Sequence, residues 1–132
     1  MPPPVAITQY DNMTGICLYR SGPYQVQMFT AKPNSSAPSH IHPNVDSYEL
    51  YLSGDLDFVI DGIFYSHEQI KQAPAPVRIF PHYWHEGITG NKGGCFLSIQ
   101  KWLNNKPPTC VGDDWVDIHG NKVGNCPSKE KD

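Results

Sequence analysis

Two of the six histidines in this chain stand one residue apart, and the other four follow downstream. His40 and His42 open the stretch HIHPNVDSYELYLSG, which runs from residue 40 to residue 54. Alternate side chains of a β-strand share one face, so both imidazoles can point to the same side. Two imidazoles in such positions can hold a divalent metal ion, and a third ligand must then come from a distant strand.

His85 is the best candidate for that third ligand, because it follows a proline turn and begins a new apolar segment. The alternative is that His40 and His42 are surface residues of a loop rich in Ser and Pro. We prefer metal binding because His85 and Gly54 accompany the pair. Turn or surface positions are expected for the remaining histidines, His67, His82 and His119.

The segments around these histidines have the composition of strands. A chain of 132 residues is the size of one domain, and its thirteen prolines and eleven glycines leave no sustained helical period. Apolar runs with aromatic and β-branched members predict an all-β fold. We expect strands over 24–31, 77–80 and 94–103, an edge strand over 15–20, a hairpin over 55–67 that turns at Asp61-Gly62, a loop over 32–39 and a small hairpin around 119–120.

Composition excludes several classes of function. The net charge is −3 and the ten basic residues are scattered, so no nucleic-acid partner is expected. No apolar run reaches the roughly twenty residues that span a membrane, and the first residues do not resemble a secretory signal. The four cysteines form no C-x-x-C pair. We therefore expect a cytoplasmic protein with reduced thiols, with a loop closed by Cys110 and Cys126 as the alternative.

The stretch that begins at His40 resembles the first motif of the cupin family, which reads glycine, five residues, H-x-H, three or four residues, glutamate, six residues, glycine. His40, His42 and Gly54 match it, whereas Asn34 stands at the opening glycine and Ser47 at the glutamate. The second motif reads proline, one residue, glycine, two residues, histidine, three residues, asparagine. His85 matches its histidine, and the other positions differ: Phe80, His82 and Thr89. The resemblance implies a jelly-roll β-barrel.

The missing motif glutamate leaves three candidates to complete the site: Asp46, Ser47 and Glu49. Ser47 is a poor ligand for a divalent metal. Asp46 has the tighter permitted spacing after His42 but would need a bulge before Gly54. Glu49 shares strand parity with Ser47, so it faces the cavity if Ser47 does. That register turns three apolar residues outward, and because cupins often pair through such a surface the resemblance implies a homodimer: Tyr48, Leu50 and Leu52.

These observations predict one cupin domain over residues 1–132, with a barrel core at about 24–103 and an irregular tail at 104–132. We expect one divalent transition metal per chain, Fe, Mn, Ni, Cu or Zn, held by His40, His42 and His85, with Glu49 as fourth ligand or general base. Such a site would suit a metal-dependent enzyme acting on a small polar organic substrate, by dioxygenase-like or isomerase and lyase chemistry. The alternative is a non-catalytic cupin that binds a sugar or another small ligand.

Overall fold

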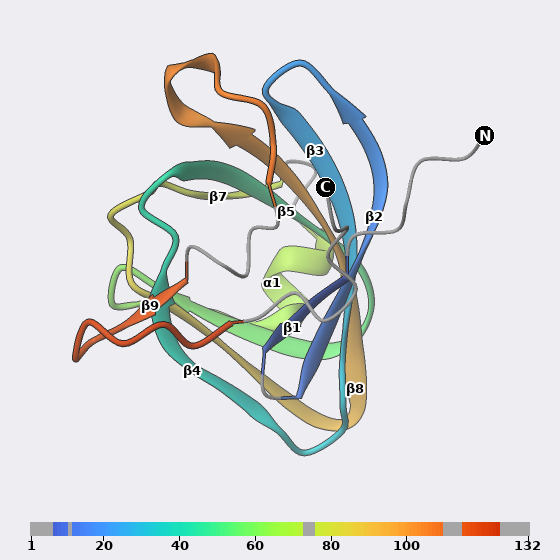
Figure 1. Cartoon of the computed structure of the whole chain (residues 1–132). Helices are drawn as coiled ribbons and strands as arrows, with labels where there is room; N and C mark the ends of the chain where they lie inside the picture. The colour runs from blue at the N-terminus through green and yellow to red at the C-terminus, as the bar shows by residue number, and fades with distance from the viewer. Residues whose placement is uncertain (1–6, 11, 73–75, 110–114, 125–132) are drawn as a thin grey trace.

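The computed structural model describes residues 7–10, 12–72, 76–109 and 115–124, and they form a β-barrel-like sheet with one short helix (Figure 1). The all-β prediction is confirmed. The elements in chain order are β1 (Ile7–Tyr10), β2 (Met13–Ser21), β3 (Tyr24–Ala31), β4 (Ser36–Ile41), β5 (Val45–Ile60), β6 (Ile63–Tyr65), α1 (His67–Gln72), β7 (Val77–Ile79), β8 (His85–Trp102), the 3-10 turn Leu103–Asn105 and β9 (Val116–Asp117).

The two longest strands, β5 and β8, form the centre of the sheet. They pair antiparallel along almost their whole length, from Val45 opposite Trp102 to Ile60 opposite His85. On its other edge β8 pairs first with β4 and then with β3, so its two halves belong to opposite sides of the barrel. Figure 1 shows the strands curving around a central space, with β2, β3 and β8 along one side and β4, β7 and β9 on the other.

The bend that allows this closure lies where β5 meets the middle of β8. Register shifts occur between Tyr51 and Ser53 and between Gly54 and Leu56. The carboxylate of Asp55 accepts hydrogen bonds from the backbone N–H groups of Gly90 and Lys92 across this bend. These bonds satisfy backbone donors that the interrupted ladder leaves without a strand partner.

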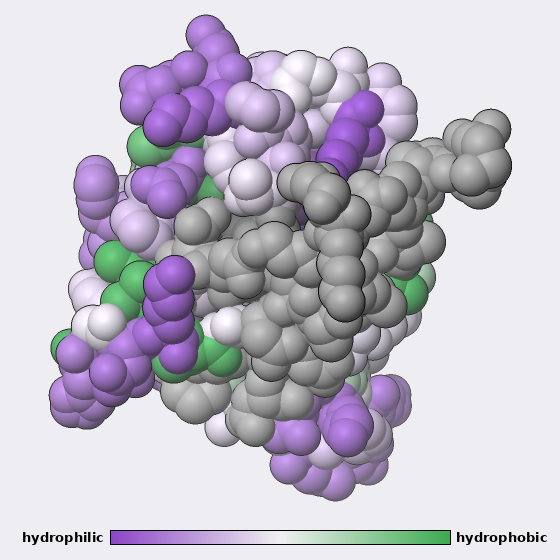
Figure 2. Space-filling view, in the orientation of Figure 1, coloured by the Kyte–Doolittle hydropathy of each residue, from purple (hydrophilic) through white to green (hydrophobic). Residues whose placement is uncertain are grey.

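The apolar core fills the space inside the barrel. Phe29 of β3 stacks on Phe96 of β8 at 5.3 Å between ring centroids and on Trp115 at 6.0 Å. Met13 of β2 and Trp115, which precedes β9, are both buried in this core. The sheet is therefore wider than the expected core of residues 24–103, because strands before and after it also contribute side chains. Hydrophilic side chains gather at the loop ends at the top and bottom of the molecule (Figure 2).

Several predicted elements are confirmed. The hairpin between β5 and β6 turns at Asp61 and Gly62, both of which have positive φ angles. The strand predicted over 77–80 is β7. The small hairpin near residue 120 pairs Val116 with Lys122.

Other expectations need correction. The predicted loop over 32–39 ends earlier, because β4 begins at Ser36 and pairs with β8. The strand predicted over 94–103 is the second half of β8, which starts at His85. The edge predicted over 15–20 is confirmed only in part: Gly15 and Ile16 pair with both β1 and β3, whereas among the described residues the rest of the segment pairs with β3 alone. The helix α1 was not expected from the sequence.

The cysteines divide between described and undescribed parts of the chain. Cys17 and Cys95 are free thiols. Cys110 and Cys126, for which a bridge was the alternative, lie outside the described residues. Among the described residues no helix is long and apolar enough to span a membrane.

Candidate functional site

Three buried histidines meet inside the barrel. His40 of β4 is the direct strand partner of His85 of β8, and their ring centroids are 4.2 Å apart. His42 follows the end of β4, and its ring centroid lies 4.8 Å from that of His85. Each of the three is less than 7% exposed. The structure therefore brings together the three histidines that the sequence singled out.

Backbone carbonyl groups orient two of these rings. The Nδ1 atom of His42 lies 3.0 Å from the carbonyl oxygen of Val45, and Nδ1 of His85 lies 2.9 Å from that of Tyr83. A carbonyl oxygen only accepts hydrogen bonds, so Nδ1 of each ring carries the proton. The lone pair of a neutral imidazole then lies on Nε2, which is the tautomer that binds a metal through Nε2.

Burial keeps these imidazoles neutral. Loss of solvation lowers the pKa of His42 below its usual value. The pKa of His85 is lowered much further, first by burial and then by repulsion from the nearby His40 and His42. Neutral imidazoles are the form that metals bind, so the electrostatic environment agrees with a ligand role.

The turn that leads into β4 is fixed by a residue at a degenerate motif position. Thr89 stands where the second motif has asparagine, and its hydroxyl donates to the carbonyl oxygen of Lys32 at 2.6 Å. It also accepts from the backbone N–H of Ser35 at 3.0 Å. Asn34, at the position of the motif glycine, has a φ of 52°, a left-handed conformation that glycine adopts readily. Thr89 and Asn34 differ from the motif residues, but the hydrogen bonds of Thr89 and the left-handed conformation of Asn34 still form the turn that precedes His40.

Glu49 of β5 faces the same interior. Its side chain is 5% exposed, and Oε1 accepts hydrogen bonds from the hydroxyl groups of Ser47 at 3.1 Å and Ser98 at 3.3 Å. Oε2 is buried and has no hydrogen-bond partner in the described part of the chain. Burial raises the pKa of Glu49 to about 7, because the loss of solvation outweighs the two serine hydrogen bonds.

The register predicted for β5 is confirmed. Ser47 and Glu49 are buried, whereas Tyr48 and Leu52 are exposed. Asp46 is also on the outer face, where its carboxylate accepts hydrogen bonds from the guanidinium of Arg78. Of the two acidic candidates for the site, Glu49 lies in the interior and Asp46 does not.

The histidines and Glu49 line one small cavity with aromatic walls formed mainly by Phe29, Phe58, Phe96 and Trp115. The volume open to the centre of a water molecule is about 30 Å³. That volume holds about two water molecules, or a metal ion with a water, but not a sugar ring. Within the described ranges, no three His, Cys, Asp or Glu side chains already have their donor atoms arranged around one metal position.

The other histidines lie elsewhere. His82 and His119 are exposed, and His67 at the start of α1 pairs with Asp57 through Nδ1 at 2.7 Å. Their expected positions outside the site are confirmed. Sequence reasoning missed Ser98, Gln100 and Trp115 as cavity residues. The polar side chains of Ser98 and Gln100 alternate with apolar ones, which identifies a strand but not its inner face.

Comparison with known proteins identifies the fold. No family model and no curated protein matches the sequence. Among solved structures, a cupin-2 domain from Rhodospirillum rubrum is 18% identical, with a TM-score of 0.58 over 76% of this chain and 68% of that one. An uncharacterised protein with a double-stranded β-helix domain from Klebsiella pneumoniae is 17% identical, with a TM-score of 0.57 over 93% and 89%.

An oxalate decarboxylase is also similar, at 18% identity and a TM-score of 0.57, over 76% of this chain and 29% of that chain. At these identities the likeness concerns the fold alone. The antiparallel strands that close around a small interior agree with that likeness. The chain has the cupin fold.

Proposed function

We propose that the cavity binds one divalent transition metal through His40, His42 and His85 and that Glu49 transfers protons to and from a small polar organic substrate. The observation that carries the proposal is the placement of a buried carboxyl with a pKa of about 7 in the same cavity as three buried histidines. Perturbed carboxyls beside possible metal ligands are typical of catalytic sites.

The donor set fits a divalent transition metal. Imidazole nitrogen suits iron, manganese, nickel, copper or zinc, and the backbone contacts of His42 and His85 leave Nε2 of each ring as the donor. The ring of His85 now contacts those of His40 and His42, so binding requires the three rings to turn their donor atoms to a common point. When bound, the metal would polarise a carbonyl or carboxyl group of the substrate.

Glu49 would supply the proton transfer. A group with a pKa near 7 is populated in both protonation states at neutral pH, so it can accept or donate a proton. Oε2 has no hydrogen-bond partner among the described residues and is therefore the oxygen that can exchange the proton. These properties favour isomerase or lyase chemistry over oxygen chemistry. The present cavity has room for a metal ion and about one water, so a substrate must be small and the side chains that line the cavity must move apart to admit it.

Metal content tests this proposal. Untagged protein purified without chelator is expected to contain about one transition metal per chain by elemental analysis. The double variant His40→Ala/His42→Ala is expected to contain only background metal. The matched control is His82→Ala/His119→Ala, which removes two exposed histidines and should keep the wild-type content.

Absence of bound metal in the wild type, together with no uptake of iron, manganese, nickel, copper or zinc on titration, would contradict the proposal. The barrel would then be a binding module for a small ligand. The size of the cavity argues against a sugar inside it, so that ligand would be only a few atoms in size or bind elsewhere.

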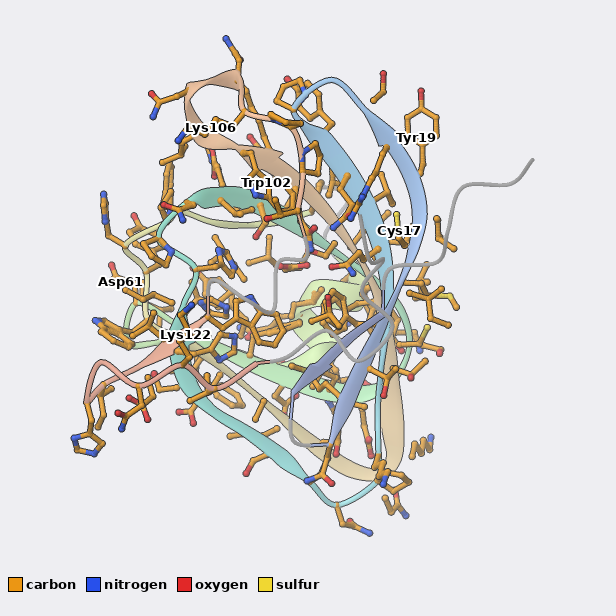
Figure 3. All side chains as sticks on the ribbon, viewed as in Figure 1. Cys17, Tyr19, Asp61, Trp102, Lys106 and Lys122 are labelled. Carbon is orange, nitrogen blue, oxygen red and sulfur yellow. The ribbon has the colours of Figure 1, made fainter. Side chains whose placement is uncertain are left out.

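We also propose that the outer face of the sheet pairs with a second copy of the chain. The strand register places two apolar rows across β2, β3, β8 and β5: Ile16, Met28, Leu97 and Leu50 in one, and Tyr19, Val26, Ile99 and Tyr48 in the other. Tyr19 is 60% exposed and extends away from β2 in Figure 3. Ile16, Tyr19 and Tyr48 are exposed and the other five side chains are half-buried, and a contiguous apolar surface of this kind is typical of interfaces.

Leu97→Lys places a charge in the middle of this face and is expected to convert a dimer into a monomer. Light scattering after size-exclusion chromatography measures the mass directly. Gln72→Lys, on the exposed surface of α1, is the control and should leave the mass unchanged. A monomeric wild type at micromolar concentration would refute the pairing.

A further inference from the structure

A continuous chain of hydrogen bonds runs from the surface of the barrel to the cavity carboxyl. Nε of Arg20 donates to Oε1 of Gln25 at 2.6 Å, and Nε2 of Gln25 donates to Oε1 of Gln100 at 2.8 Å. Nε2 of Gln100 donates to Oγ of Ser98 at 3.1 Å, and Ser98 donates to Oε1 of Glu49 at 3.3 Å. Gln25, Gln100 and Ser98 are each at most 3% exposed.

Arg20 fixes the direction of this chain. A guanidinium has donors and no acceptor, so the oxygen of the Gln25 amide must face it. The amide nitrogen of Gln25 then faces inward, and Gln100 must meet it with its own oxygen. The nitrogen of Gln100 is left to donate in two directions, to Ser98 and to Oε1 of Gln27 at 2.9 Å.

The direction of these hydrogen bonds determines which groups donate to the carboxyl of Glu49. The hydroxyl of Ser98 accepts from Gln100, so its single proton is available for Oε1 of Glu49. Ser47 donates to the same oxygen. Oε1 is therefore occupied as an acceptor, whereas Oε2 has no partner among the described residues.

We propose that the chain from Arg20 to Ser98 is a positioning device, in which the surface cation fixes the direction of each hydrogen bond and thereby makes Oε2 the oxygen of Glu49 that exchanges protons in the cavity. Arg20, Gln25, Gln100 and Ser98 are then positioning residues and not catalytic ones. The hydrogen-bond direction is independent of any metal, and only its role in proton transfer rests on the proposed function.

A buried polar network of this kind has a high cost unless every member is satisfied. Three buried glutamine side chains would be costly to desolvate if their only role were to fill the interior of the barrel. The branch to Gln27 ends on the hydroxyl of Thr8, at 3.0 Å from Nε2. Each of the glutamine amide groups thus has partners at both its oxygen and its nitrogen.

The substitution Gln25→Glu tests the direction with almost no change of shape. A carboxylate at this position still accepts from Arg20 but cannot donate to Gln100. The Gln100 amide must then rotate, so that its nitrogen donates to residue 25 and its oxygen faces Ser98. The Ser98 hydroxyl would turn to that oxygen, and Glu49 would lose one of its two hydrogen bonds.

Gln27→Glu is the matched control. It introduces the same chemical change at another fully buried position of β3. A carboxylate at position 27 accepts from Nε2 of Gln100 as the present amide oxygen does. The direction of the chain from Arg20 to Glu49 is therefore unchanged in this variant.

The first readout is the side-chain amide cross-peaks of Gln100 in a ¹H–¹⁵N correlation spectrum of metal-free protein. We expect the larger displacement in Gln25→Glu, where the Gln100 amide reverses, a smaller one in Gln27→Glu, where Nε2 of Gln100 keeps its partner but meets a carboxylate, and none for the exposed Gln69 and Gln72 in either variant. Thermal unfolding verifies that the variants are folded. Equal displacement of the Gln100 cross-peaks in the two Glu variants would overturn the proposal.

The second readout is the visible absorption spectrum and the dissociation constant of added Co²⁺. Ser98→Ala and Gln25→Glu are expected to change the spectrum and to raise the dissociation constant in the same direction as Glu49→Gln, because each alters the carboxyl that lines the same cavity as the histidines. Gln27→Glu should stay close to the wild type. A wild-type spectrum and affinity in Ser98→Ala would refute the positioning role.

Failure of the two proposals can be distinguished. If the wild type binds no Co²⁺, the proposed metal-dependent function fails. The direction of the hydrogen-bond chain is then decided by the Gln100 cross-peaks alone. If Co²⁺ binds and the cross-peaks do not respond to Gln25→Glu, the metal site stands and the positioning device does not.

Discussion

Gly54→Ala is expected to lower the free energy of unfolding by about 4 kcal/mol, measured by urea denaturation. Gly54 has a φ of 92°, where residues with a side chain are strained. A Cβ at this position would overlap the carbonyl oxygen of Gly93 and come within 2.8 Å of Cα of Gly94. Both contacts are with backbone atoms of β8, which cannot move aside without breaking its pairing with β5.

Gly62→Ala separates the two contributions to that loss. Gly62 in the hairpin turn has a φ of 77°, but no atom lies within 4 Å of its added Cβ. Its replacement should cost only the backbone strain, about 1 to 2 kcal/mol. If the two substitutions destabilised the chain equally, close contact between β5 and β8 would not explain the glycine at position 54.

The glycine at the end of the first motif is thus explained by the bend of the barrel. The motif spacing located this glycine correctly. The bend that requires a glycine at position 54 is also the bend that places the two halves of β8 on opposite sides of the barrel. The histidines were predictable for a related reason. His40 and His85 are strand partners, because β4 pairs with the first half of β8 as the sheet curves around the cavity.

The face of β5 was also predictable, although it reverses the usual pattern. Tyr48 and Leu52 are outside and Ser47 and Glu49 inside, as the motif register required. The same reversal in β3 and β8 could not be deduced. The alternation of YQVQMFTA and LSIQKW predicts strands, but their glutamines and serine are buried, together with Phe29 and Trp102, whereas Val26, Met28, Leu97 and Ile99 lie on the other, partly exposed face. A polar residue is buried only where it has partners, and those partners are on other strands.

The roles of Trp115 and Met13 depend on contacts between distant parts of the chain. Trp115 lies in a polar tail segment, and a single aromatic residue there gives no periodic signal. In the structure its ring lies 4.7 Å from that of His40 and closes one wall of the cavity. Trp115 follows β8, the last long strand, and packs back against residues far earlier in the chain. A local sequence pattern cannot predict such a contact.

Glu49→Gln is expected to change the pH dependence of stability, because the folded chain raises the pKa of this carboxyl from 4.5 to about 7. Between these two values the folded wild type holds a proton that the unfolded chain has released. The free energy of unfolding of the wild type therefore falls as the pH rises across this interval, and it becomes flat above it. The pKa difference corresponds to a loss of about 3 kcal/mol.

Glutamine does not titrate, so the free energy of unfolding of the variant lacks the fall that Glu49 causes between the two pKa values. In metal-free protein with chelator, the stability of Glu49→Gln relative to the wild type should improve by about 3 kcal/mol between pH 4.5 and pH 8, as measured by urea denaturation at each pH. The buried histidines titrate in both proteins and cancel in the difference. Glu68→Gln removes an exposed carboxyl on α1 and serves as the control. A difference between Glu49→Gln and the wild type that does not vary with pH would contradict a buried, neutral Glu49, and with it the assignment of this carboxyl as the group that exchanges protons at neutral pH.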